Sequence, residues 1–264
     1  MSNTQGMAMK VFGFANQKGG VGKTTTLINL ASELAKTKQV LVIDLDPQSN
    51  CTKALTSKRG YGFDTSVAAM FDKPKVISLN DIIVPALDGG EDIIDNLYIA
   101  PSDFSLSKVI ETSLTKINRE QILEKQLKKL EKHYDYVLLD TPPNLSLTTL
   151  NALKASEFVI IPVDSGAFSL DGIDPLLEAI EEVTDEEPNY VIVRNEVDTR
   201  NAIINDYLDD ELETTEYNIL PFQIRKTESI GQAHALYTPL RFYKPGSVVN
   251  NDYRKLAKFV SEEL

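Results

Sequence analysis

The residues of this chain that could do chemistry begin with a glycine-rich segment near the N-terminus. An apolar run, Val11 to Ala15, precedes the segment, and apolar residues at helical spacing follow it from Thr24. The segment comprises Lys18, Gly19, Gly20, Val21, Gly22, Lys23, Thr24 and Thr25. Between a strand and a helix, glycines let backbone N–H groups and the helix N-terminus approach phosphate oxygens closely. The spacing therefore predicts a phosphate-binding loop.

Carboxylates that follow apolar, strand-like runs form the second chemical feature. Asp44 and Asp46 come directly after one such run, and Asp140 ends another, Tyr136 to Leu139. Parallel strands present their carboxyl ends at the ligand-binding edge of an α/β sheet, so we expect these acids to lie there. Asp44 and Asp46 could instead cap the turn that follows them.

These residues need a scaffold, and the rest of the chain supplies one. Short apolar runs alternate with longer amphipathic stretches, as in strand-helix-strand units around a parallel sheet. The predicted strands are Val11 to Ala15, Val40 to Leu45, Leu97 to Ala100, Tyr136 to Leu139, Phe158 to Val163, Tyr190 to Val193 and Asn218 to Leu220. The predicted helices are Thr24 to Lys36, Arg119 to Lys132, Leu147 to Ala155, Leu170 to Val183, Ala202 to Leu212 and Val248 to Glu263. We predict an α/β fold with a twisted, mostly parallel sheet and helices on both faces, and only loops and short helices from Thr56 to Asp95.

Composition limits the class of protein. Cys51 is the one cysteine among 264 residues, which excludes an internal disulfide and a Cys-x-x-Cys site and fits a reducing cytoplasm. No stretch approaches the about 20 apolar residues of a membrane-spanning helix. The net charge of −12 argues against a globally basic nucleic-acid binder. The charge is uneven, however, because the segment from Gln223 to Lys258 is locally basic and follows an acidic one.

The phosphate loop departs from the generic pattern in an informative way. That pattern requires glycine where this chain has Gln17, and the chain instead adds a lysine, Lys18. The sequence K-G-G-V-G-K-T-T closely resembles the deviant Walker A loop of the ParA/MinD family of ATPases. The resemblance implies a P-loop NTPase fold, ATP or ADP and Mg²⁺ as cofactors, and one ATPase domain over residues 1–264. We also expect a flexible segment at residues 1–9 and no N-terminal helix-turn-helix domain.

The resemblance implies a role for each side chain of the loop. Lys23 would contact the β- and γ-phosphates, Thr24 would ligate Mg²⁺ and Thr25 would lie at the α-phosphate. Lys18 would reach across an ATP-bound sandwich dimer to the phosphates held by the other subunit. Dimerisation and hydrolysis would then both depend on the nucleotide.

The same resemblance implies roles for the three acids. Asp46 would position or activate the attacking water, and Asp44 would support the Mg²⁺ region. Asp140 ends a strand that matches the Walker B pattern, so its carboxylate would hold Mg²⁺ through water.

A looser resemblance to Soj/ParA partition proteins covers the C-terminal half. It implies adenine near Asn195 and Pro221, and nonspecific DNA contacts from Arg200 and Arg225. Such phosphate contacts are sequence-independent and salt-sensitive. An ordinary turn and strand end, or a solvated basic surface, would explain the same residues. Many relatives carry an Arg-Gly pair near the C-terminus where this chain has Lys244 to Val248, so one basic contact could be moved or missing.

We therefore predict a plasmid or chromosome segregation ATPase. Its ATP-bound homodimer would bind DNA nonspecifically, and a centromere-binding adaptor protein would stimulate hydrolysis. The protein would be cytoplasmic and nucleoid-associated, with no stable membrane association. One alternative is a MinD-like membrane-positioning ATPase, although the final helix is short and ends in acids. The other is a metabolic P-loop ATPase or ligase, but Cys51 alone cannot supply the paired cysteines of a bridging iron–sulfur cluster.

Overall fold

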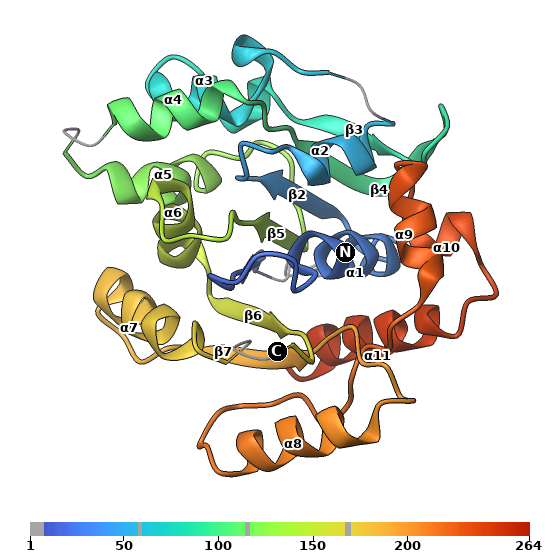
Figure 1. The fold of residues 1–264 in the computed structure, drawn as a ribbon. Helices are drawn as coiled ribbons and strands as arrows, with labels where there is room; N and C mark the ends of the chain where they lie inside the picture. Colours follow the sequence, from blue (N-terminus) through green and yellow to red (C-terminus); the bar gives the residue numbers. More distant parts are fainter. Residues whose placement is uncertain (1–7, 58–59, 114–116, 167–169) are drawn as a thin grey trace, which may run out of the picture.

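One α/β domain accounts for the residues that the computed structural model describes, 8–57, 60–113, 117–166 and 170–264 (Figure 1). Its sheet has seven strands in the order β3-β4-β2-β5-β1-β6-β7. The strands are β1 (Lys10–Phe14), β2 (Val40–Asp44), β3 (Val84–Leu87), β4 (Ile93–Ala100), β5 (Tyr136–Asp140), β6 (Phe158–Val163) and β7 (Tyr190–Arg194). All neighbouring pairs are parallel except β3 and β4. The predicted fold class is confirmed.

Helices connect the parallel strands, because a chain that joins two parallel strands has to cross from one end of the sheet to the other. The α-helices are α1 (Lys23–Leu34), α2 (Asn50–Leu55), α3 (Val67–Asp72), α4 (Ser105–Thr112), α5 (Ile122–Leu127), α6 (Leu147–Ala155), α7 (Ile173–Thr184), α8 (Ala202–Glu213), α9 (Glu228–Ala235), α10 (Leu240–Tyr243) and α11 (Val249–Glu262). Within the described ranges, three short 3₁₀ helices occupy Phe63–Thr65, Leu79–Asp81 and Arg119–Gln121.

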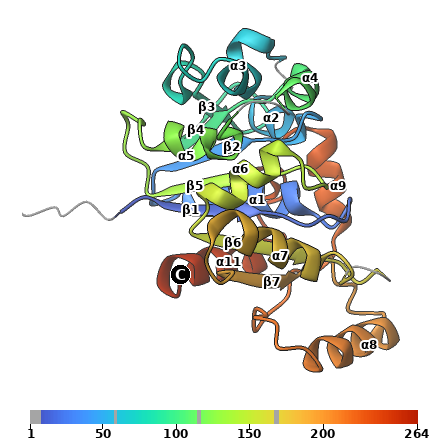
Figure 2. The same ribbon diagram turned by 90° about the vertical axis from the view of Figure 1, so that its left-hand side faces the viewer.

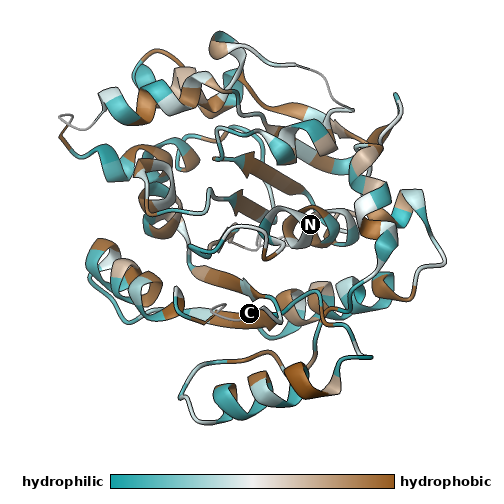
Figure 3. Cartoon of the chain, in the orientation of Figure 1, coloured by the Kyte–Doolittle hydropathy of each residue, from teal (hydrophilic) through white to brown (hydrophobic). Residues whose placement is uncertain are grey.

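The central strands are buried on both sides, which explains why they are apolar along most of their length (Figure 3). Successive residues of a strand point to opposite faces, so Phe12 and Val11 enter different core clusters. On one face α1, α2 and α11 pack against the sheet, and on the other α3 to α7 do so. Figure 1 shows the two helix layers on either side of the strands, and Figure 2 looks onto the sheet from the side of α5, α6 and α7. The carboxyl ends of β1, β2 and β5 therefore open at one edge between these layers.

One predicted strand is wrong. Asn218 to Leu220 forms only an isolated bridge, between Ile192 and Ile219, and adds no strand to the sheet. The backbone N–H of Leu220 still donates to the Ile192 carbonyl, at 2.9 Å.

The helix predicted over Arg119 to Lys132 is shorter than expected and is split between a 3₁₀ turn and α5. It ends early because the Asn80 side chain binds the backbone on the C-terminal side, accepting from Glu131 N and donating to the Lys129 carbonyl. β3 was not predicted. It is an edge strand of four residues that contains Pro85, and proline is tolerated at a sheet edge.

We predicted a flexible segment at residues 1–9. Residues 1–7 of this segment lie outside the described residues. Across the described parts of the chain, none of the helices has the length and apolar character needed to cross a membrane.

Candidate active site

The phosphate loop joins β1 to α1 and depends on glycines with left-handed backbone. Gly20 has φ of 81° and Gly22 has φ of 83°, values that side chains other than glycine rarely adopt. Two asparagines hold the loop in this shape. Asn16 Oδ1 accepts from Lys18 N at 2.8 Å, and Asn195 Nδ2 donates to the Val21 carbonyl at 2.8 Å. The loop is therefore preshaped by contacts from outside it.

Gly22→Ala should disrupt this shape. A Cβ at this position would lie 2.2 Å from Asn195 Nδ2, and the positive φ would strain any side chain. We expect the affinity for ATP to fall at least about tenfold, since such strain costs about 1–3 kcal/mol. Titration calorimetry would measure it, with Gly246→Ala as the control because nothing lies within 4 Å of a Cβ there. Unchanged ATP affinity in the Gly22 variant would contradict a preshaped loop.

The two lysines of the loop lie in different surroundings. Lys23 is 7% exposed, and its Nζ donates to the carbonyls of Asn16 and Lys18 at 2.8 and 3.1 Å. Burial lowers the pKa of Lys23, although the charges of Asp140 and Asp46 act in the opposite direction. Lys18 points away from the cradle, and its Nζ pairs with Asp164 at 2.9 Å. Only Lys23 is thus placed inside the loop.

Asp44 and Asp140 are register partners at the ends of β2 and β5, and both are fully buried. Asp44 accepts from Thr52 N, Thr52 Oγ1 and Asp46 N at 2.8, 2.7 and 3.1 Å. Burial raises the pKa of the Asp44 carboxyl to about 6 despite these hydrogen bonds. Burial, followed by the charge of Asp44, holds the pKa of Asp140 well above its usual range.

Asp140 and Thr24 provide a donor set that fits Mg²⁺. Thr24 Oγ1 donates to Asp140 Oδ2 at 2.8 Å, while Asp140 Oδ1 is buried and has no hydrogen-bond partner among the described residues. No group of three or more histidine, cysteine, aspartate or glutamate ligands occurs among the described residues. Mg²⁺ does not need such a cage, because one or two protein oxygens complemented by nucleotide phosphates and water suffice. Asp44 instead accepts hydrogen bonds from Thr52, beside Asp140.

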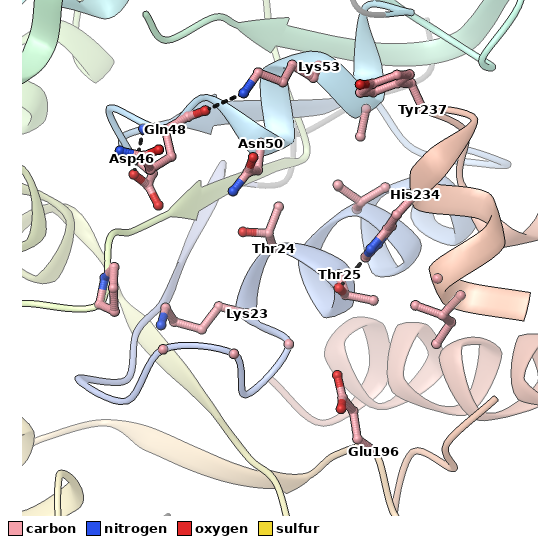
Figure 4. A pocket seen from close by; sticks show the side chains of 18 of the residues that line it. Lys23, Thr24, Thr25, Asp46, Gln48, Asn50, Lys53, Glu196, His234 and Tyr237 are labelled. Atoms are coloured by element: carbon pink, nitrogen blue, oxygen red, sulfur yellow. Dashed lines mark hydrogen bonds between the residues drawn. The ribbon is translucent and has the colours of Figure 1, made fainter. Parts of the chain in front are cut away.

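A cavity of about 710 Å³ opens beside the loop (Figure 4). Asp46 lines it near Lys23 and Thr24, and its Oδ1 accepts from Gln48 N at 2.8 Å. On the other side α9 forms a wall, where His234 Nε2 lies 3.3 Å from Thr25 Oγ1. Burial lowers the pKa of His234.

Sequence reasoning missed much of this cavity. The lining residues that it did not single out are Ile28, Asn50, Lys53, Ala54, Glu196, Lys226, Thr227, Glu228, Ile230, Gly231, His234 and Tyr237. One signal for α9 was available. Thr227 is an N-cap whose Oγ1 accepts from Ser229 N, and an acid, Glu228, follows it in the first turn.

Two residues expected near adenine do not line the cavity. Asn195 is 1% exposed and lies under the loop, where it supports Val21. Pro221 lines a separate depression of about 380 Å³, together with Arg194 and Asp209.

Both arginines expected to contact DNA are paired within the chain. Arg200 contacts Asp198 at 2.7 Å and is exposed. Arg225 donates to both carboxylate oxygens of Asp252, at 2.8 Å each, and to the Val248 carbonyl. Arg225 therefore has to exchange a bidentate partner before it can hold a phosphate through those donors.

Comparison with known proteins decides the family. A family model described as an AAA domain matches residues 9–193. The chromosome partitioning protein ParA of Caulobacter vibrioides is 32% identical over 264 aligned residues, which cover 96% of this chain and 94% of that protein. The chain belongs to the ParA/MinD family of ATPases. The sporulation initiation inhibitor protein Soj of Bacillus subtilis is 37% identical over 65% of this chain, but the match spans only 64% of Soj.

Solved structures agree with this ParA/MinD fold. A plasmid partition protein from Borrelia burgdorferi superposes with a TM-score of 0.75 at 22% identity, covering 97% of this chain and 99% of that one. Cobyrinic acid a,c-diamide synthase from Mycobacterium smegmatis, with bound ATP analogue and magnesium, gives 0.79 at 26% identity, covering 97% and 95%. The nucleotide and Mg²⁺ in that neighbour agree in kind with the cofactors predicted from the loop.

Proposed function

We propose that this ParA/MinD family member is a Mg²⁺-dependent ATPase that segregates plasmid or chromosomal DNA. In this proposal ATP drives a sandwich homodimer, the dimer binds DNA nonspecifically, and a centromere-binding adaptor stimulates hydrolysis and release. The protein would act in the cytoplasm on the nucleoid. The observation that carries the proposal is the likeness to ParA of Caulobacter vibrioides along nearly the whole chain.

The site's own residues would carry out hydrolysis as follows. Backbone N–H groups of the loop and the Lys23 ammonium would hold the phosphates, and Thr24 and Asp140 would hold Mg²⁺. The bound metal supplies positive charge against the phosphate oxygens. Asp46 accepts a hydrogen bond from a water and orients it toward the γ-phosphorus. The water oxygen forms the new P–O bond, the bond to ADP breaks, and the proton leaves toward Asp46 or the phosphate.

Lys18 would act on the other subunit. In the single chain its ammonium is held by Asp164, and both side chains are partly exposed, at 29% and 23%. An exposed pair of this kind contributes only about 0–1 kcal/mol. The partner subunit's phosphates, which carry more charge, would therefore replace Asp164 at little cost. Asp164 would keep the lysine near the cavity until a second subunit arrives.

Nonspecific DNA binding is tested by retention on DNA with ATP, with ADP and without nucleotide. We expect retention only with ATP, and we expect it to weaken as salt rises. Arg225→Ala should weaken DNA binding for all sequences. It should also reduce the slope of the logarithm of the binding constant against the logarithm of salt concentration by about one. The control is Lys128→Ala, since this exposed lysine directly follows α5, on the other face of the sheet, and pairs with Glu124. Nucleotide binding without any salt-sensitive retention would overturn the segregation proposal.

One observation favours a second candidate, an ATP-dependent ligase. The amide-forming synthase of Mycobacterium smegmatis shares the fold over 97% of this chain. Turnover that requires a small carboxylic acid acceptor would support this candidate over segregation.

The membrane alternative gains no support from α11. Its apolar residues Val249, Tyr253 and Leu256 are buried in the core cluster that contains α1, so they are not free to enter a bilayer. ATP-dependent binding to anionic liposomes would revive this alternative.

A further inference from the structure

Glu196 stands out on the cavity wall because its backbone is in an unusual conformation. Its φ is 54°, a left-handed value that is uncommon for a residue other than glycine. Both neighbours are fixed. Asn195 N donates to the Val163 carbonyl at 2.7 Å, and Val197 N donates to the Ile224 carbonyl at 3.1 Å. The surrounding structure thus imposes this conformation, as often occurs where a side chain must be aimed at a ligand.

The carboxylate that this backbone presents has no direct partner. Within the described chain Glu196 forms no hydrogen bond or ion pair, although Lys226 also lines the cavity and attracts it electrostatically. Burial raises the pKa of Glu196. A half-buried carboxylate only accepts hydrogen bonds when ionised, so a ligand that complements it must offer O–H or N–H donors.

The position of the carboxylate selects the sugar over the base. Glu196 Oε1 lies 3.3 Å from the point that a Cβ on Gly22 would occupy, directly beside the phosphate loop. Figure 4 shows its side chain directed toward the loop, with His234 across the cavity. With Thr25 at the α-phosphate, as the proposed function has it, the ribose is the next group along the nucleotide. Its vicinal hydroxyls are two donors suited to one carboxylate.

We propose that Glu196 binds the ribose hydroxyls of the nucleotide and makes this pocket select ribonucleotides over 2′-deoxyribonucleotides. The inference rests on the proposed ATPase function but not on DNA binding. The competing role for Glu196 is electrostatic support of the α1 N-terminus, which begins at Lys23. That role would affect all nucleotides equally.

The test compares the Kd of ADP and 2′-deoxy-ADP, each with Mg²⁺, by titration calorimetry. Because hydrogen bonds to a charged group are strong, we expect the wild type to prefer ADP about tenfold. Glu196→Ala should bring that ratio to about one, and Glu196→Gln should give an intermediate ratio while keeping the side chain's shape. Glu228→Gln is the matched control, since it removes another acid of the same cavity wall and should leave the ratio intact.

Three results would overturn the inference. They are a wild type that does not discriminate, a ratio that persists in Glu196→Ala, and an equal loss of affinity for both nucleotides. Failure of the proposed function has a different signature. A wild type that binds no nucleotide would refute the ATPase itself, and ADP binding without ATP-dependent DNA retention would refute segregation alone.

Discussion

Lys18→Ala is expected to abolish ATP hydrolysis while leaving ATP affinity within about twofold of the wild type. Lys18 lies outside the phosphate cradle and pairs with Asp164, so its loss should not disturb nucleotide binding in one subunit. A cation supplied in trans to the transition state is worth about a thousandfold or more in rate. Steady-state phosphate release and titration calorimetry would measure the two effects separately.

The matched control is Asp164→Ala, which removes the other member of the ion pair. If Lys18 acts only by holding Asp164, the two variants should behave alike. If it acts on the second subunit, Asp164→Ala should retain hydrolysis because the lysine itself is unchanged and can still cross. Hydrolysis by Lys18→Ala at the wild-type rate would show that Lys18 does not act on the nucleotide of the second subunit.

Asp140→Asn should make the nucleotide-free protein more stable and at the same time inactive. Its buried carboxylate faces the charge of Asp44, and one of its oxygens has no hydrogen-bond partner within the part of the chain that the structure describes. Removing this charge should raise the free energy of unfolding by about 1–3 kcal/mol, which corresponds to a rise in Tm of about 5 °C. Hydrolysis should fall at least about a hundredfold, because Asp140 is a proposed Mg²⁺ ligand.

The pH dependence of stability gives this prediction a second readout. The folded-state pKa of Asp44, about 6, lies above the ordinary value of 3.8 expected in the unfolded chain. The folded state therefore binds more protons between these values, and the resulting stabilisation is lost as pH rises through about 6. Asp140 is shifted in the same direction. In thermal melts, the Tm of the wild type should fall more between pH 5 and pH 7.5 than the Tm of Asp140→Asn. An Asp140→Asn variant less stable than the wild type at pH 7.5 would contradict this explanation.

The sequence predicted best those elements whose residue types leave few choices. The runs that form β2 and β5 are apolar on both faces, which indicates buried parallel strands. The phosphate loop could be predicted because its glycines are required at particular backbone angles. The different surroundings of its two lysines became visible only in the structure, which places Lys23 inside the loop and Lys18 against Asp164.

What the sequence could not predict depends on contacts between distant segments. Glu196 and His234 are 38 residues apart in the numbering, yet they line one cavity with the loop. Pro221 follows the bridge at Ile219 and faces another depression, which no local pattern indicates. The pairing of Arg225 with Asp252 likewise joins two segments and removes an apparent free cation from the surface. Charge counts along a chain cannot reveal such neutralisation.

We expect ATP to switch this chain between monomer and dimer, and a measurement of the mass in solution distinguishes the two states. Light scattering after gel filtration should give the mass of one 29.4 kDa chain without nucleotide or with ADP. With ATP and Mg²⁺, and Asp46→Ala to slow hydrolysis, it should give twice that mass, and adding Lys18→Ala should reduce the dimer. A protein that binds ATP by calorimetry but keeps the monomer mass at every ATP concentration would contradict the switch.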